Sequence, residues 1–92
     1  MNAPRTPLDD RRKRLLFRSW HRGTRELDLL LGRFAERHLS EFSESEIDLF
    51  ENILEQGDSD LYDWIAGKAS IPAESRNAVL DLLVNFKPGP DS

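Results

Sequence analysis

The chain of 92 residues predicts an all-α fold, in which five short helices form one small, bundle-like domain. Apolar residues recur three and four positions apart along most of the chain, which is the spacing of one helix face. No segment alternates between apolar and polar residues with the β-branched enrichment of a strand. We expect the domain to occupy residues 9–86, between a flexible arm at residues 1–8 and a disordered tail at residues 87–92.

The first predicted helix begins at Asp9 or Asp10, either of which can cap it, and ends near His21. Three large apolar residues at helical spacing are expected to face the core: Leu16, Phe17 and Trp20. The other side of this helix is basic at residues 11–14. This basic run is either a solvated helix face or a contact surface for an acidic partner.

A glycine then interrupts the helical pattern at residues 22–28, which read RGTRELD and which we refer to as the corner. Glycine is acceptable as the N-cap of a helix, and a glutamate three residues later can reach back to the capping amide. Gly23 and Glu26 have this spacing. The pattern predicts a joint between two helices that displays a polar patch of Arg22, Arg25 and Glu26.

The second predicted helix runs from about Thr24 to His38, whose place in the last turn suits the helix dipole. Its core-facing stripe consists of four apolar residues: Leu27, Leu30, Leu31 and Phe34. Gly32 lies inside this pattern and either weakens the helix or allows another element to approach closely.

A capping box at Ser43 and Glu46 begins the third predicted helix, and Phe42 can pack against Ile47 across that start. The residues expected to face inward are Ile47, Phe50, Ile53 and Leu54. The outer face is acidic, and we interpret it as a solvated face rather than a pair of catalytic carboxylates. Gly57 is expected to end this helix as its C-terminal cap.

The fourth predicted helix begins at residues 58–60 and ends at Gly67, with Leu61, Trp64 and Ile65 on one side. The fifth is expected to begin at residues 70–74, because Pro72 is tolerated in a first helical turn, and to run to about Phe86. Its inward residues are predicted to be Val79, Leu82, Leu83 and Phe86.

Composition excludes several classes of function. The absence of cysteine rules out disulfides, thiolate metal sites and a thiol nucleophile, and is compatible with a reducing compartment. The net charge of −4 opposes general nucleic-acid binding, and no apolar run is long enough to span a membrane. There is no phosphate-binding glycine loop, and His21 and His38 lack the spacing of metal ligands or of a catalytic triad. We therefore expect a helical interaction module without catalytic or metal-binding residues, located in the cytoplasm of a bacterium.

The corner resembles the Arg-Gly-x-x-Glu signature, followed by Leu-Asp, of the succinate dehydrogenase assembly factors. Residues 39–46 are similar to that family's entry into its third helix, and residues 58–65 resemble its Asp-x-Asp-Leu-aromatic-x-Trp segment. The resemblance covers about residues 10–86, nearly the whole domain. It implies a five-helix fold and a non-enzymatic FAD assembly factor, which promotes covalent attachment of FAD to the flavoprotein subunit of succinate dehydrogenase and, in bacteria, of fumarate reductase.

The resemblance carries the family's partner-binding role to Arg22, Gly23 and Glu26, and we include Arg25 and Asp28 from the same stretch. Three roles stay open for Glu26: it caps its own helix, contacts the partner, or does both. The resemblance also implies that FAD is the cofactor of the partner and is not held stably by this chain. In such flavoproteins a histidine joins the 8α-methyl carbon of the flavin, and a helper protein need only align the reacting groups.

One other function and one purely structural interpretation of the corner stay open at this point. An antitoxin-type or nucleic-acid-binding small regulatory protein would use the basic run at residues 11–14 and would bind DNA or RNA with steep salt dependence. In the purely structural interpretation of the corner, Arg22 and Glu26 form only a local surface ion pair.

Overall fold

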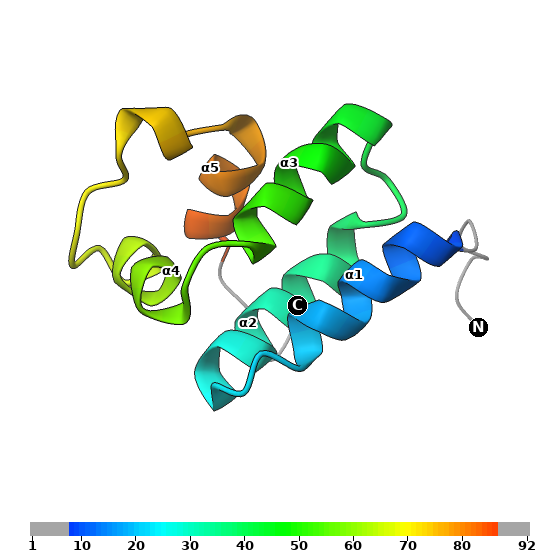
Figure 1. Cartoon of the computed structure of the whole chain (residues 1–92), viewed down its shortest axis with the longest axis horizontal. Coiled ribbons are helices and arrows are strands. Elements are labelled where there is room, and N and C mark those ends of the chain that lie inside the picture. Colours follow the sequence, from blue (N-terminus) through cyan, green and yellow to red (C-terminus); the bar gives the residue numbers. More distant parts are fainter. Residues whose placement is uncertain (1–7, 87–92) are drawn as a thin grey trace.

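The computed structural model describes residues 8–86 and folds them into five α-helices and one 3₁₀ turn, with no strand in that range (Figure 1). The elements are α1 (Asp10–Trp20), α2 (Arg25–His38), α3 (Glu44–Leu54), α4 (Asp58–Ile65), η1 (Ala73–Ser75) and α5 (Ala78–Val84). The all-α prediction is confirmed. The predicted arm and tail lie outside the described residues, apart from Leu8, which packs against the core.

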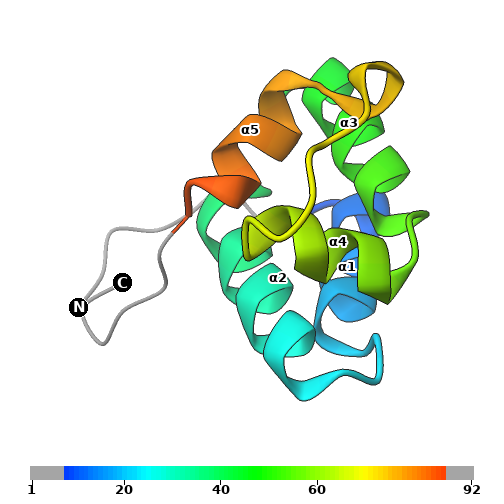
Figure 2. The same ribbon diagram turned by 90° about the vertical axis from the view of Figure 1, so that its left-hand side faces the viewer.

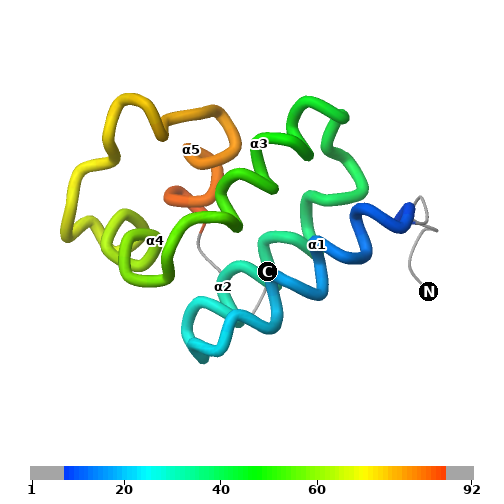
Figure 3. Tube along the Cα trace, in the orientation of Figure 1, coloured from blue at the N-terminus to red at the C-terminus, as the bar shows by residue number. Residues whose placement is uncertain are grey.

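The helices form two groups that share α3. α1 and α2 lie antiparallel, side by side, and α3 contacts α1 on one side and α5 on the other (Figures 1 and 2). α4 contacts α5 and follows α3 through a short connection, as the chain trace shows (Figure 3). The corner between α1 and α2 lies near the connection between α3 and α4, because Arg22 donates to the carbonyls of Leu54 and Gln56.

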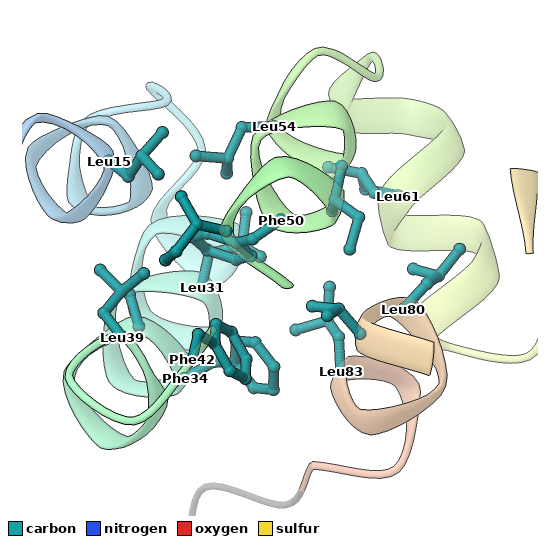
Figure 4. Packing of buried hydrophobic residues seen from close by; sticks show 14 of the residues in the cluster. Leu15, Leu31, Phe34, Leu39, Phe42, Phe50, Leu54, Leu61, Leu80 and Leu83 are labelled. Atoms are coloured by element: carbon teal, nitrogen blue, oxygen red, sulfur yellow. The ribbon is translucent and has the colours of Figure 1, made fainter. Parts of the chain in front are cut away.

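Every α-helix contributes to a single hydrophobic core, shown in Figure 4. Among its fully buried members are Leu15, Leu31, Phe34, Phe50, Leu61 and Leu83. The inward residues predicted for α3 are all buried, and so are Leu27, Leu31 and Phe34 of the α2 stripe, whereas Leu30 is half-buried. Burial of these side chains is the main term that stabilises so small a domain.

The predicted inner face of α1 is wrong by one position. Leu15 and Ser19 are buried, whereas Leu16 and Trp20 are half-buried and Phe17 is 64% exposed. The Ser19 hydroxyl donates to the Leu15 carbonyl at 2.8 Å, so its burial leaves no unpaired polar atom. Leu15 and Ser19 have the same four-residue spacing as Leu16 and Trp20, so periodicity alone is compatible with either pair on the inner face.

Gly32 allows α1 to approach α2 closely, which is one of the two interpretations left open by the sequence. A Cβ atom at this position would overlap the indole ring of Trp20, so the glycine makes room for that ring between α1 and α2. The Trp20 Nε1 donates to a carboxylate oxygen of Glu36 at 3.1 Å, which orients the ring. The absent side chain thus fixes how closely the first two helices pack.

The helix boundaries confirm some cap predictions and overturn one. The capping box of Ser43 and Glu46 is present in both directions, and Phe42 and Ile47 are both buried.

Gly67, at φ +76°, follows the end of α4 as predicted. Gly57 does not cap α3: it has φ −70° and is the N-cap of α4, because the chain passes from Leu54 through a connection of only three residues.

The predicted start of the fifth helix is also wrong. Pro72 begins only the 3₁₀ turn η1, and the backbone becomes extended again at Arg76 and Asn77. The Asn77 side chain then caps α5 by accepting from the Leu80 amide at 2.7 Å. This later start buries Val79, Leu80 and Leu83, whereas Leu82 is 45% exposed and Phe86 is half-buried.

The basic run at residues 11–14 is largely used inside the molecule. Arg11 pairs with Asp48 at 2.6 Å and Glu51 at 2.7 Å on α3, and these carboxylates raise the pKa of Arg11. Arg12 donates to the backbone carbonyls of Leu39 and Phe42 at 2.8 and 2.6 Å. Arg11 and Arg12 are thus bound within the domain, so they form neither a solvated face nor a surface free for an external acidic partner. Only Lys13 and Arg14 of the run are exposed, which leaves a nucleic-acid-binding function little basic surface.

Candidate functional site: the corner between α1 and α2

Thr24, and not Gly23, is the N-cap of α2, so the predicted capping box of Gly23 and Glu26 is wrong. Gly23 has φ +99°, a left-handed conformation that disfavours other residues, whereas an N-cap is typically extended. No side chain of the described residues caps α2, and Asp28 in its first turn binds the two residues before the N-cap instead. Its Oδ1 accepts from the backbone amides of Arg22 at 2.8 Å and Gly23 at 3.2 Å.

The Arg22 side chain points inward and joins the corner to the connection between α3 and α4. It is only 11% exposed, and its Nε donates to Asp58 Oδ1 at 2.7 Å. Its Nη1 donates to the Leu54 carbonyl at 2.9 Å and its Nη2 to the Gln56 carbonyl at 2.6 Å. Carbonyls at the end of a helix lack intrahelical partners, and Arg22 supplies them for α3. Arg22 is therefore not part of a displayed patch and does not pair with Glu26.

Asp58 completes this connection from the first turn of α4. Its Oδ2 accepts from the Thr24 hydroxyl at 3.0 Å while its Oδ1 accepts from Arg22. The position of a carboxylate at a helix N-terminus is favourable. Sequence reasoning missed both residues for the site: Thr24 lies at a variable position of the signature, and Asp58 was predicted only to begin a helix. The only sequence signal that could have linked Thr24 and Asp58 was that the corner and the Asp-x-Asp segment both occur in this chain.

The exposed part of the corner consists of Gly23, Arg25 and Glu26. A Cβ atom at Gly23 would meet nothing within 4 Å, so its outer side is open. Within residues 8–86, neither the Arg25 nor the Glu26 side chain makes a hydrogen bond or an ion pair. The structure thus separates the predicted site residues into an inner set that shapes the corner, Arg22 and Asp28, and an outer set that is free to meet a partner.

The two histidines do not form a catalytic or metal site. The His21 Nδ1 lies 2.8 Å from the Phe17 carbonyl, and its ring stacks on Phe17 with centroids 3.9 Å apart. His38 packs between aromatic rings, and burial, followed by the nearby charge of Arg37, lowers its pKa, contrary to the expected support of a cation by the helix end. The described part of the chain contains no cluster of three potential metal ligands.

Between residues 8 and 86, no helix has both the length and the apolar character needed to cross a membrane.

Comparison with known proteins identifies relatives over most of the chain. The family model described as "Flavinator of succinate dehydrogenase" matches residues 13–87. The "FAD assembly factor SdhE" of Acetobacter pasteurianus is 42% identical over 77 residues, which are 84% of this chain and 71% of that protein. The mitochondrial "Succinate dehydrogenase assembly factor 2" of Dictyostelium discoideum is 37% identical over 83 residues, and that of Drosophila grimshawi is 36% identical over 84 residues.

The matched regions cover 90% and 89% of this chain but only 59% and 57% of those two mitochondrial proteins. The family and these relatives are named as a flavinator and as assembly factors, not as enzymes, in agreement with the prediction from sequence. The extent of the family match and the identity to the bacterial assembly factor lead to one assignment: the chain belongs to the family of succinate dehydrogenase flavinators, Sdh5.

Proposed function

We propose that this chain binds the flavoprotein subunit of succinate dehydrogenase through the corner and promotes covalent attachment of FAD to that subunit. The observation that carries the proposal is the open, unpartnered surface of Gly23, Arg25 and Glu26, held in place from behind by Arg22. The proposal extends to the fumarate reductase flavoprotein as a second client. Its setting is the cytoplasm of a bacterium, since the 42% identical relative is bacterial.

The proposed contribution to the reaction is alignment. FAD would stay with the client and would supply the 8α carbon that bonds to a client histidine. When that carbon loses a proton, the flavin ring would take up the electron pair of the broken C–H bond, and its reoxidation would fall to the client's own electron acceptor. This chain would supply alignment only, with no proton or electron of its own. Orientation of reacting groups alone lowers a barrier by up to ~7–11 kcal/mol for ideal geometry. A helper that binds the aligned state of the client more tightly than other states shifts the population toward it.

The inner and outer residues divide this task. The hydrogen bonds of Arg22 and Asp28 hold the corner in one conformation, which lowers the entropy lost on binding. Gly23 allows the client backbone to approach closely. Glu26 has no internal partner and is free to accept hydrogen bonds from the client.

Co-expression of the chain with the flavoprotein subunit, followed by in-gel flavin fluorescence of that subunit, tests the proposal. We expect Gly23→Arg and Glu26→Ala to remove most of the covalent flavin signal while circular dichroism shows a folded chain. Gly23→Ala is the control for backbone strain alone, and Glu74→Ala is a control for loss of an exposed glutamate on η1. Wild-type fluorescence with both Gly23→Arg and Glu26→Ala would exclude the corner from the process.

A further inference from the structure

An apolar groove lies directly beside Glu26. It has a volume of about 250 Å³ and lies between α2 and α4, which run close to each other in Figure 2. Its lining residues are Glu26, Leu27, Leu29, Leu30, Tyr62 and Ile65. Glu26 is the only charged residue of this lining, so the groove offers an apolar floor with a carboxylate at one side.

The groove is exposed rather than filled by the domain's own side chains. Leu29 is 44% exposed, and Leu30, Tyr62 and Ile65 are only half-buried. Two other large hydrophobic residues are exposed within residues 8–86, Phe17 and Leu82. Neither of them lines this groove. Contiguous exposed apolar surface with a polar edge is typical of a protein interaction site.

The charges around the groove indicate what kind of segment fits it. Glu26 has no partner within the described residues, and the lining contains no basic side chain. On the α4 side, the Lys68 ammonium lies over the Tyr62 ring, 5.2 Å from its centroid. A partner cation is therefore attracted to the Glu26 side, whereas the Tyr62 side already has a positive charge close by.

We propose that this groove receives a large apolar side chain of the client flavoprotein, of the leucine or phenylalanine class, from a segment whose neighbouring lysine or arginine pairs with Glu26. The identity of the partner rests on the proposed function. Glu26 belongs to both the corner and the groove, so an interface at the corner continues into the groove without a gap. The volume is below the ~300–1,000 Å³ of typical small-molecule sites, which favours a protein side chain over a dinucleotide as the occupant.

Two leucines with nearly equal exposure provide a matched test. Leu29 lines the groove and Leu82 lies on α5 away from it, and they are 44% and 45% exposed. The affinity of each purified variant for the purified flavoprotein subunit without covalent FAD is measured by isothermal titration calorimetry. Leu29→Asp should raise the Kd at least about tenfold, as expected for a central apolar anchor, and Leu82→Asp should change it by less than about twofold.

Leu29→Ala is included because it removes the apolar contact without adding a charge, and it should weaken binding less than Leu29→Asp does. Circular dichroism of each variant confirms that it is folded. An unchanged Kd for both Leu29 variants, or equal weakening by Leu82→Asp, would overturn the groove as a contact site. Absence of binding by the wild-type chain would instead overturn the proposed function, so the two failures are distinguishable.

The occupant is identified by placing the photoreactive residue p-benzoylphenylalanine at position 29 and mapping the crosslinked client peptide. We expect the adduct on or beside a large apolar residue with a lysine or arginine within a few positions. A crosslink to a segment without basic residues would contradict the assignment of Glu26 as the partner of a cation. The same label at position 82 should give no specific adduct with the client.

Discussion

Arg22 is the residue through which the corner and the rest of the domain are connected. Its planar guanidinium presents donors in three directions, and Asp58 Oδ1 and the carbonyls of Leu54 and Gln56 lie 2.7, 2.9 and 2.6 Å away. A lysine ammonium is a single point of charge and does not reproduce this fork. These three hydrogen bonds therefore tie the corner to the rest of the fold, and under the proposed function Arg22 affects partner binding only through the shape it gives to the corner.

We predict that Arg22→Lys lowers the free energy of unfolding by about 1–3 kcal/mol, because half-buried carbonyl acceptors lose their donors. It should also reduce covalent flavinylation of the client. Urea denaturation measures the first effect and in-gel flavin fluorescence the second. The matched control is Arg25→Lys, a neighbouring arginine that is exposed, for which a stability change below about 0.5 kcal/mol is expected. Equal stability of the two variants would show that the Arg22 hydrogen bonds contribute nothing.

Gly32 provides a second prediction at this scale. Alanine is the better helix former by about 1 kcal/mol, but a methyl group here would overlap the Trp20 ring, and overpacking costs about 1–3 kcal/mol. We expect Gly32→Ala to destabilise the domain and to shift its tryptophan fluorescence. Gly57→Ala is the comparison, since a Cβ atom there meets nothing within 4 Å. A Gly32→Ala variant more stable than the wild type would show that the ring moves aside without cost.

At the scale of helices, local signals predicted the elements better than their ends. The capping box at Ser43 identified the start of α3 because both of its hydrogen bonds form between residues three apart. For α5 the sequence predicted a start at residues 70–74, whereas the N-cap lies at Asn77. The register that buries Leu80 together with Val79 and Leu83 requires the later start, and that choice depends on packing against α3.

Dependence on contacts between distant residues also limited what the sequence could predict about the site. Exposure of Glu26 at a helix start was predictable, but the bond between Arg22 and Asp58 joins residues 36 positions apart and has no local pattern. Gly23 does lie at the predicted joint between two helices, although its left-handed backbone makes it the residue before the cap rather than the cap. Tertiary contacts, not propensities, decided which corner residues face inward.

The side-chain cap of α5 leads to a prediction at this scale. Asn77→Ala removes the bond from Asn77 to the Leu80 amide and should lower stability by about 1 kcal/mol. For a domain of this size that corresponds to a fall of about 4–8 °C in Tm, measured by circular dichroism. Asn85→Ala serves as the control, because that side chain makes only an exposed bond to the Asp81 carbonyl. An unchanged Tm for Asn77→Ala would imply that packing alone sets the start of α5.

For the whole molecule, His38 lies where the two groups of helices meet. Its ring packs against Phe34 on α2 at 4.6 Å, Phe42 before α3 at 5.6 Å and Phe86 after α5 at 6.3 Å, as centroid distances. Burial lowers the pKa of His38, the Arg37 charge lowers it further, and Glu41 and Glu46 oppose this in part. The folded state therefore holds this imidazole neutral, among apolar rings, at a pH where the unfolded chain takes up a proton.

This difference predicts that global stability falls in mild acid. Because the unfolded state binds the proton more tightly, the free energy of unfolding has its full value above pH ~6.5 and decreases as the pH falls below it, by at most ~1.4 kcal/mol per pH unit. Asp9, whose pKa is lowered chiefly by the Arg12 amide, loses its contribution only near pH 4 and below, outside this window. Urea denaturation between pH 5.0 and 7.5 should show the decrease in the wild type and in His21→Gln, but not in His38→Phe, which keeps an aromatic ring without a titrating group. If the free energy of unfolding of His38→Phe decreases with pH in parallel with that of the wild type, another group is responsible for the acid sensitivity.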